Sequence, residues 1–210
     1  MLQRRLLDIA IREFGLKGLE GASTRKIAAA ADTAMSSITY HYGGKEGLYL
    51  AAADYIAGQM GEYMAAAFEP DEIPGTPEGA RAAIHRILGA FVSKMASDEN
   101  SSWSLFIVRE QMNPTEAFER IYGGLMGRMM ERLVELVCIA TGWRDASTAQ
   151  VATITLFGQV VVIRASRAAC LKLLKRDTMD EFAATALGAR VAANTDAILD
   201  RLIAERQELP

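Results

Sequence analysis

The sequence predicts an all-α fold. Of its 210 residues, 50% are hydrophobic and only 7% are aromatic, and it is rich in Ala, Leu, Met, Glu and Arg, which are the strongest intrinsic helix formers. Strand-like alternation of Val, Ile and Thr is almost absent, and proline occurs five times. A chain of this length can bury a sizeable core, either in one large domain or in a small domain beside a larger one.

Two helices are expected before the first tight turn. Apolar side chains recur at helical spacing over residues 2–17, and Gly18 and Gly21 then end the first helix because glycine leaves the backbone free to turn. Ser23 or Thr24 can cap a short second helix, which reads Arg-Lys-Ile followed by four alanines. Only its isoleucine and one of its last two alanines can face inward.

The next segment completes a helix-turn-helix pattern. Residues 32–34 form a three-residue turn, residues 35–42 form a helix of about two turns, and Gly43-Gly44 reverses the chain into a long helix that runs to about Phe68. Two short helices joined by such a turn have the dimensions of a DNA-binding unit whose second short helix enters the major groove.

One linker divides the chain. Residues 69–77 contain three prolines, and Thr76 with Pro77 then opens a new helix as its cap and first position. We therefore expect a DNA-binding domain over residues 1–50 and a larger helical domain over residues 51–210. After the linker, the helices are expected at about 78–96, 102–112, 115–141, 147–175 and 179–206.

Charge and cysteine usage limit the functions that the chain can have. Residues 1–50 carry seven basic and five acidic side chains, whereas the rest carries 16 and 21, which is compatible with a local contact between the head and a polyanion. Cys138 and Cys170 lie in apolar helical stretches without metal-ligand neighbours, which indicates buried free thiols in a reducing compartment. No metal and no cofactor is expected.

Neither a leader sequence nor a membrane span is expected. The first fourteen residues alternate charged and apolar side chains, unlike a signal peptide. The longest apolar run, over residues 156–163, contains Gly158 and Gln159 and is too short to cross a bilayer. The sequence thus predicts a cytoplasmic protein that does not interact with membranes.

The stretch ITYHYGGKEGLY, over residues 38–49, concentrates the groups that suit DNA. Ile38 and Tyr42 are four residues apart and should share a buried face, so the side chains between them point elsewhere. Hydroxyl, ring and cationic groups suit phosphate oxygens and base edges, and Lys45 lies where the start of the long helix also favours an anion. The predicted DNA contacts are Thr24, Arg25, Ser36, Ser37, Thr39, Tyr40, His41 and Lys45.

These residues carry a resemblance. The stretch from Ile9 to Tyr49, with STRKIAAAA, the turn and ITYHYGGKEGLY, resembles the DNA-binding domain of the TetR family of bacterial transcriptional repressors. The resemblance implies that Tyr42 stands where the family usually has a buried Phe, and that Tyr40, His41 and Lys45 stand at DNA-contact positions. The family commonly has Gly in the turn where this chain has Asp32, so Asp would have to adopt a left-handed conformation there.

A second motif is similar to one branch of that family. The segment REQMNPTEAFERIY, over residues 109–122, resembles the motif that follows the sixth helix in the CecR-like branch. The resemblance implies a helical domain that binds a small-molecule effector and dimerises.

The middle helices hold many Met and aromatic side chains, which could line a cavity for an apolar ligand. The alternative for each of them is ordinary core packing. Four polar residues, Arg109, Glu110, Gln111 and Arg164, lie in or beside these apolar runs, where they would orient a ligand or pair with each other as ion pairs. His85 has no acid or cysteine at ligand spacing, so it is expected to be solvated or pocket-lining. The predicted ligand-binding residues are Trp103, Phe106, Arg109, Met112, Tyr122, Met126, Phe157 and Arg164.

Stripes of small and branched residues on the last two long helices predict a four-helix dimer interface, with packing inside one chain as the alternative. A two-fold axis would also suit palindromic DNA half-sites. The predicted interface residues are Val151, Ile154, Gly158, Val161, Ala165, Leu187, Val191, Ile198 and Leu202.

Together these observations predict a homodimeric transcriptional regulator, most simply a repressor, that binds a palindromic double-stranded operator and is released by a small, apolar effector. Effector binding among residues 78–170 would shift the long helix over residues 45–68 and so change the separation of the two DNA-binding heads. An enzyme is disfavoured because the chain lacks a phosphate loop, a nucleophile elbow and any metal-ligand cluster. The remaining alternative is a carrier or interaction protein whose head no longer binds DNA.

Overall fold

The computed structural model describes residues 2–68, 74–97 and 101–208. Within these ranges the chain forms helices joined by turns and contains no strand, which confirms the all-α prediction. The chain divides into two compact units. The head unit comprises residues 1–63 and 99–127, and the body unit comprises residues 64–98 and 128–210.

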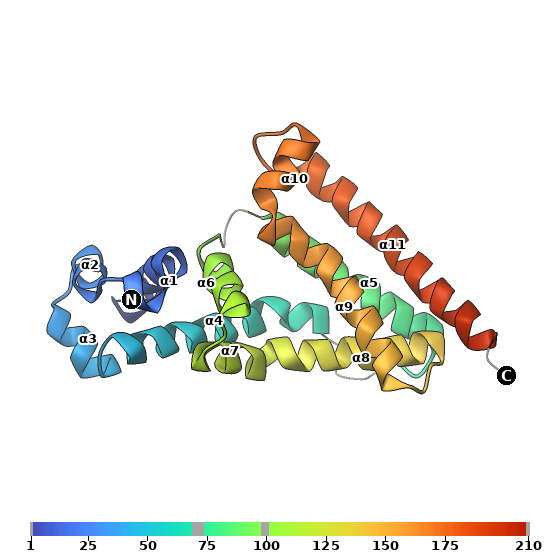
Figure 1. Cartoon of the computed structure of the whole chain (residues 1–210), viewed down its shortest axis with the longest axis horizontal. Coiled ribbons are helices and arrows are strands. Elements are labelled where there is room, and N and C mark those ends of the chain that lie inside the picture. The colour runs from blue at the N-terminus through green and yellow to red at the C-terminus, as the bar shows by residue number, and fades with distance from the viewer. Residues whose placement is uncertain (1, 69–73, 98–100, 209–210) are drawn as a thin grey trace. The chain divides into compact units, whose positions relative to one another are not determined.

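The head unit contains the predicted helix-turn-helix, and further helices that come much later in the sequence (Figure 1). Its elements are α1 (Leu2–Gly21), α2 (Thr24–Ala30), α3 (Met35–Tyr42), the first part of α4 (Lys45–Phe68), α6 (Ser101–Met112), α7 (Glu116–Ile121) and the π-helical turn η1 (Tyr122–Met126).

Local backbone chemistry sets the first three turns. Gly18 has φ 73° and breaks α1 after its regular part, and the Ser23 hydroxyl accepts a hydrogen bond from the Lys26 amide to cap α2. Asp32 has φ 56° in the turn between α2 and α3, so the left-handed conformation predicted for this residue is confirmed. Gly43, at φ 75°, then ends α3.

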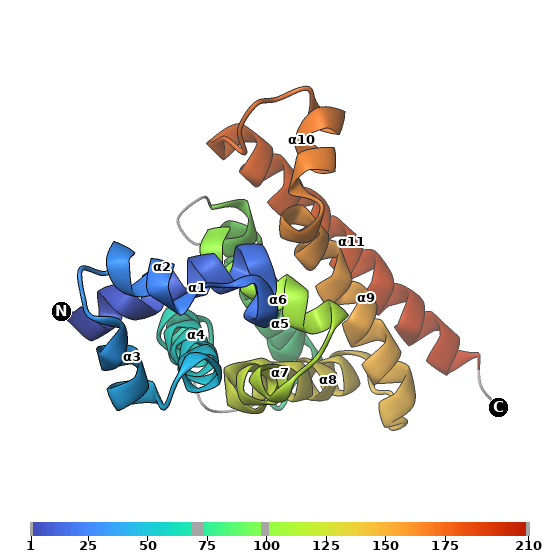
Figure 2. The same cartoon turned by 60° about the vertical axis from the view of Figure 1, so that its left-hand side comes forward.

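Helices α6 and α7 complete the core of the head unit. The Tyr49 ring on α4 lies 4.9 Å from the Phe14 ring on α1 and 4.6 Å from the Phe106 ring on α6, centroid to centroid. Ala117 and Ile121 from α7 are buried in the same core. Helix α6 contacts α1, and Figure 2 shows the two side by side. Helices α1 to α4 therefore share one core with residues 106–126.

The body unit is built on three long helices that lie side by side in Figures 1 and 2: α5 (Pro77–Ala96), α9 (Ala146–Ala165) and α11 (Glu181–Gln207). Most of α8 (Gly127–Thr141) and the short α10 (Arg167–Leu174) complete it. As predicted, the Thr76 hydroxyl caps α5 and Pro77 is its first residue. The rest of the predicted linker, residues 69–73, lies outside the described residues.

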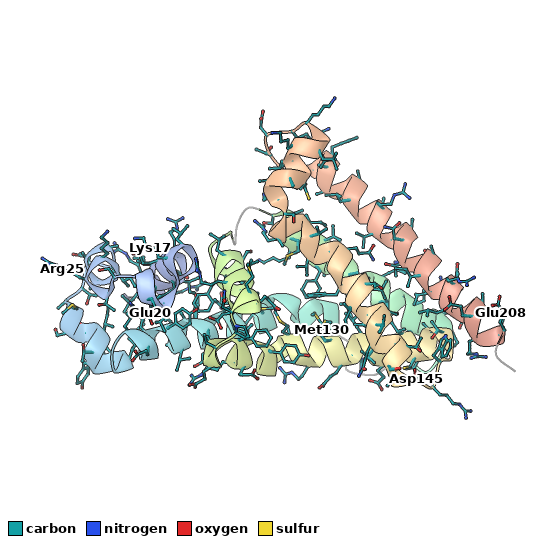
Figure 3. All side chains as sticks on the ribbon, viewed as in Figure 1. Lys17, Glu20, Arg25, Met130, Asp145 and Glu208 are labelled. Carbon is teal, nitrogen blue, oxygen red and sulfur yellow. The ribbon has the colours of Figure 1, made fainter. Side chains whose placement is uncertain are left out.

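Helix α9 begins at a strong cap and lies among other helices. The Asp145 carboxylate accepts hydrogen bonds from Ser147 and Thr148 at the corner between α8 and α9 (Figure 3). By length and composition alone α9 could cross a membrane. However, it contacts α5, α10 and α11, and the Phe157 ring on α9 meets the Phe91 ring on α5 edge-on at 5.5 Å.

Two predicted helices are wrong in their continuity, and one prediction about the cysteines is wrong. The helix expected over residues 115–141 is interrupted by η1, where Gly124 leaves the helical region with ψ −133°. The helix expected over residues 147–175 breaks at Ser166, with φ −115° and ψ 31°. Cys138 and Cys170 are free thiols, as predicted, but both are only half-buried.

Candidate nucleic-acid interface

Helix α3 separates a buried side from an exposed side. Ile38 is 1% exposed and packs in the head core, whereas Tyr40 is 85% exposed. Ser36, Thr39 and His41 are exposed as well, while Ser37 is half-buried and hydrogen-bonds to the turn through the Thr33 hydroxyl at 3.2 Å. The predicted division of this helix into an inner and an outer side is therefore confirmed.

The outer side of α3 carries an aromatic pair. The rings of Tyr40 and His41 meet edge-to-face at 5.0 Å. Tyr42, on the inner side, is half-buried, and this burial raises the pKa of its phenol. Met35, at the first position of α3, is 55% exposed. Met35 was not among the residues predicted to contact DNA.

The start of α2 adds polar groups to the same segment. Ser23 rather than Thr24 caps this helix, so the Thr24 hydroxyl is not used for capping. Thr24 is half-buried and Arg25 is exposed, and Figure 3 labels Arg25 on α2. The sequence had left open which of the two hydroxyl residues forms the cap.

Lys45 links the start of α4 to α1 through a hydrogen bond. Its Nζ donates a hydrogen bond to the backbone oxygen of Glu20 at 2.8 Å, and Glu20 lies near the end of α1 (Figure 3). An ammonium group has three donors, so the side chain can still contact a phosphate at the start of α4. The sequence predicted that Lys45 contacts a phosphate, but it did not predict the hydrogen bond from Lys45 to Glu20.

A groove lies beside the helix-turn-helix, between α1 and α2. It has a volume of about 870 Å³, and it is lined by Arg4, Arg5, Arg12 and Lys26 together with two acidic side chains. The first two arginines lie within α1. Arg5 donates to the Ala30 backbone oxygen at 3.3 Å, so it joins the ends of two helices.

The predicted ligand-binding residues are divided between the two units. The head unit contains Trp103, Phe106, Arg109, Met112, Tyr122 and Met126, and the body unit contains Phe157 and Arg164. In the head unit, Phe106 and Met126 are core residues, Trp103 is half-buried, and Met112 is 75% exposed. The Tyr122 ring stacks on the Phe118 ring at 5.6 Å. Their role in ligand binding stays a prediction.

Both arginines in this set bond to helix ends. Arg109 donates to the backbone oxygens of Gly15 and Leu16 in α1, at 3.4 and 3.1 Å. Arg164 donates to the backbone oxygen of Ser97, at the end of α5. The last carbonyls of a helix lack partners within the helix and carry partial negative charge, which a guanidinium group satisfies. Sequence spacing alone did not reveal these distant carbonyl groups.

The predicted dimer residues differ in exposure. On α9, Val151 and Ile154 are 63% and 64% exposed, Gly158 and Ala165 are exposed, and Val161 is half-buried. On α11, Leu187, Ile198 and Leu202 are half-buried, whereas Val191 is 6% exposed and packs within the chain. An open groove of about 590 Å³ runs between the two helices, lined in part by Val151, Ile198 and Leu202.

His85 belongs to an ion-pair cluster between α5 and α11. Its Nε2 lies 2.9 Å from Asp196 Oδ1, and Arg81 bonds to both Asp196 and Asp200. The hydrogen bond from His85, followed by that from Arg81, lowers the pKa of Asp196 against the opposing effect of burial. The described residues contain no group of three or more His, Cys, Asp or Glu side chains that could hold a metal ion.

Comparison with known proteins gives matches along most of the chain. Residues 6–52 match the family model described as bacterial regulatory proteins, tetR family. Residues 80–202 match the model of the C-terminal domain of the HTH-type transcriptional dual regulator CecR. Over 206 residues the chain is 30% identical to the HTH-type transcriptional dual regulator CecR of Shigella flexneri, which covers 95% of this chain and 92% of that protein.

Solved structures share the fold. A transcriptional regulator from Pseudomonas aeruginosa PAO1 superposes with a TM-score of 0.69 at 21% identity, over 96% of this chain and 90% of the other. The structure of AibR in complex with isovaleryl coenzyme A and operator DNA superposes with a TM-score of 0.63 at 18% identity, over 79% and 86% of the two chains.

Proposed function

Because this chain belongs to the TetR family of bacterial transcriptional regulators, and to its CecR-like branch, we propose that it is a homodimeric repressor that binds a palindromic operator and is released by a small, apolar effector. It is a DNA-binding transcriptional regulator and not an enzyme. We place its action in the cytoplasm, where the operator lies.

The exposed side of α3 is the observation that carries the proposal. Tyr40 is 85% exposed although the neighbouring Ile38 is fully buried, so the helix is held rigidly from one side while hydroxyl and ring groups project from the other. Such a helix fits a major groove, where hydroxyl and aromatic groups meet base edges and phosphates. Arg25 and Lys45 would contact the flanking phosphates, together with Thr24, Ser36, Ser37, Thr39 and His41.

The apolar surface of α9 supports a homodimer. Val151, Ile154 and Val162 are exposed on this helix, and an exposed apolar stripe beside a groove lined by α11 is what a second copy would cover. A two-fold pair of α9 and α11 helices would give a four-helix interface. The same axis would relate two α3 helices, as a palindromic operator requires.

A small-molecule effector is proposed from the middle helices. The predicted set from Trp103 to Arg164 is rich in methionine and aromatic side chains, which adapt to apolar ligands. AibR, which shares the fold, has been solved with both isovaleryl coenzyme A and operator DNA. By analogy, an effector would release the operator if it bound more tightly to an arrangement of the two DNA-binding heads that does not fit the operator. No cofactor is needed for this mechanism.

Binding of labelled duplex DNA, taken from upstream of the protein's own reading frame, tests the proposal. Tyr40→Ala should weaken binding by roughly 5- to 150-fold, since one good contact in a DNA interface is worth about 1–3 kcal/mol. Lys45→Ala should weaken binding and also reduce its dependence on salt, because a phosphate contact releases counterions. Phe182→Ala, which removes an aromatic side chain that is 71% exposed in the body unit, should bind like the wild type.

Sedimentation and thermal melting would be measured on the same variants. Both substitutions in the head should leave the dimer intact, and Tyr40→Ala should leave the melting temperature close to that of the wild type because the side chain is exposed. Equal DNA affinity for Tyr40→Ala and the wild type would contradict the assigned interface. A wild type that binds no duplex more tightly than random DNA would instead favour a carrier.

A further inference from the structure

We propose that Glu110 is a positioning residue for the DNA-binding helices: through its two carboxylate oxygens it joins α4 to the start of α7, so that α3 and α4 cannot shift without also displacing α6 and α7 or breaking this link. The inference rests on the proposed function, because the position of α3 has meaning only if the head binds DNA. It assigns a mechanical role to one side chain on α6.

Glu110 is an unusual residue for its place in the fold. It is 2% exposed, and it is the only charged side chain among the buried residues of the described chain. Removing a carboxylate from water costs several kcal/mol in effective terms unless hydrogen bonds replace the lost solvation. An apolar residue would fill the same space without this cost, so the carboxylate is expected to have a specific role.

The hydrogen bonds of Glu110 reach two separate elements. Oε1 accepts a hydrogen bond from the Tyr49 hydroxyl on α4 at 2.5 Å. Oε2 accepts hydrogen bonds from the Thr115 amide at 3.0 Å, from the Thr115 hydroxyl at 2.9 Å and from the Phe118 amide at 3.1 Å. These amides belong to the N-terminal turn of α7, whose partial positive charge favours a carboxylate.

Tyr49 is held in place by two aromatic neighbours. It is 3% exposed, and its ring meets Phe14 of α1 edge-on and packs against the tilted ring of Phe106 of α6. Burial, followed by the hydrogen bond to Glu110, raises the pKa of the Tyr49 phenol far above its usual value. The phenol therefore stays protonated and remains a donor to Glu110 throughout the physiological pH range. Tyr49 lies one helical turn after Lys45, so its position fixes the start of α4.

The residue before Glu110 strengthens the same connection. Arg109 donates hydrogen bonds to the backbone oxygens of Gly15 and Leu16 in α1, and its guanidinium group fits closely against Gly18, where an added Cβ would lie 3.2 Å from Nη1. Two consecutive residues of α6 thus attach to α1 on one side and to α4 and α7 on the other.

Directional hydrogen bonds constrain movement in a way that apolar packing does not. If α4 slid past α7, the buried carboxylate would lose a partner while remaining out of water, and such a loss is strongly unfavourable. Two outcomes remain: the helices move together, or the bond breaks and a second arrangement is adopted. A two-state connection of this kind can pass a displacement of α6 and α7 to the DNA-binding helices.

Three variants separate this role from simple packing. Tyr49→Phe keeps the ring and removes only the hydroxyl that reaches Glu110. Glu110→Gln keeps a carbonyl oxygen for the α7 amides, and its amide group can donate to the Tyr49 oxygen, so it should preserve the link. Tyr55→Phe removes a phenol hydroxyl from the same helix without touching the Glu110 hydrogen bonds, and it serves as the matched control.

Hydrogen exchange is then measured for peptides covering α6 and α7, with and without a duplex selected from a random library by the wild-type protein. In the wild type and in Tyr55→Phe, DNA bound at α3 should slow exchange in α7, because coupling between two sites is reciprocal. In Tyr49→Phe the duplex should still slow exchange in α3, but its effect in α7 should fall by roughly tenfold or more, as expected for a lost hydrogen bond to a charged group. Glu110→Gln, as a single variant, should retain most of the DNA-dependent slowing of exchange in α7.

The outcomes distinguish this proposal from the proposed function. If selection recovers no duplex, the proposed function fails and the role of Glu110 fails with it. If the wild type binds a duplex but α7 exchange does not respond, or if Tyr49→Phe responds as fully as the wild type, the function stands and the positioning role is overturned. Glu110→Ala is avoided as the decisive variant, since it also removes the cap of α7.

Discussion

Replacement of Phe106 with alanine tests whether the DNA-binding helices depend on α6 for their folding. Phe106 is fully buried and its ring lies 4.6 Å from the Tyr49 ring, in a core that also contains Phe14 of α1. Truncation of a buried Phe to Ala costs about 3–5 kcal/mol, since it removes apolar burial and leaves a cavity. We expect the whole head unit, including residues far from position 106 in the sequence, to lose stability by this amount.

Native-state hydrogen exchange measures the loss at each helix. Amides in the buried part of α1, around Ala10 and Phe14, should exchange only when the head unit opens as a whole. A loss of about 3–5 kcal/mol should therefore speed their exchange by roughly 10²- to 4 × 10³-fold. Phe157→Ala is the matched control because it truncates the same side chain in the body unit, where Phe157 packs against Phe91. It should speed exchange in α5 and α9 and leave α1 unchanged.

One result would refute this reasoning. If Phe106→Ala speeds exchange in α6 but leaves α1 and α4 as protected as in the wild type, the three N-terminal helices fold without α6. The domain boundary predicted at residue 50 would then describe the folding units better than the division into residues 1–63 with 99–127.

Three further predictions concern single substitutions elsewhere in the chain, one of them with a matched control. Asp32→Gly should raise the free energy of unfolding by up to about 1 kcal/mol in urea titrations, because Asp32 sits at φ 56°, where glycine avoids the Cβ clash but loses more entropy on folding. Asp145→Ala should lower the melting temperature at neutral pH. Hydrogen bonds from the hydroxyls of Ser147 and Thr148, and then from the backbone, lower the pKa of Asp145 from 3.8 to about 2. The carboxylate therefore contributes its full stabilisation above pH 3.8, and the difference in melting temperature between the variant and the wild type should disappear as the pH falls toward 2. Gly124→Ala should cost about 1–3 kcal/mol by overpacking, since its Cβ would lie 3.2 Å from the Ala57 Cβ, whereas Gly123→Ala, with no atom within 4 Å of its Cβ, should be neutral or stabilising in the same titration.

Local patterns predicted the helix-turn-helix well because its determinants are close together in the sequence. Ile38 and Tyr40 are two residues apart, so helical geometry alone places one inside and the other outside. The cap of α2, the turn at Asp32 and the glycine end of α3 are likewise set by residues within a few positions of one another. The orientation and backbone conformation of the DNA-binding helices could therefore be predicted from the sequence, and the cap of α2 could be narrowed to Ser23 or Thr24.

Long-range partners were not accessible in this way. Arg109, Arg164 and His85 all drew attention as polar groups in apolar surroundings, and a ligand, an ion pair or solvent seemed the natural partner for each. Their described partners are backbone oxygens 93 residues or 67 residues away for the arginines and a carboxylate 111 residues away for the histidine. Periodicity identifies a polar group that faces inward, but it does not identify a partner on another helix.

Breaks within long helices were also missed. Gly123 and Gly124 were visible in the sequence, but a helix tolerates single glycines at a cost of about 1 kcal/mol each, so a continuous helix over residues 115–141 remained reasonable. The break occurs where Gly124 approaches Ala57 of α4, and a π-helical turn accommodates the extra residue. The helix thus breaks where η1 contacts α4, and local helix propensity alone did not predict this break.

The motif REQMNPTEAFERIY has a physical explanation that unites these points. Its first arginine caps α1, its glutamate joins α4 to α7, and the Thr-Glu-Ala-Phe segment is the turn that this glutamate caps. Apolar residues of the following segment, Ala117 and Ile121, then fill the core beneath the DNA-binding helices. A segment that connects four helices in this way is suited to transmit a displacement, because a shift of α4 relative to α7 would strain the hydrogen bonds of the buried Glu110. The proposed link through Glu110 thus gives this motif a role in the head unit beside the effector contacts that are proposed for Arg109, Met112 and Tyr122.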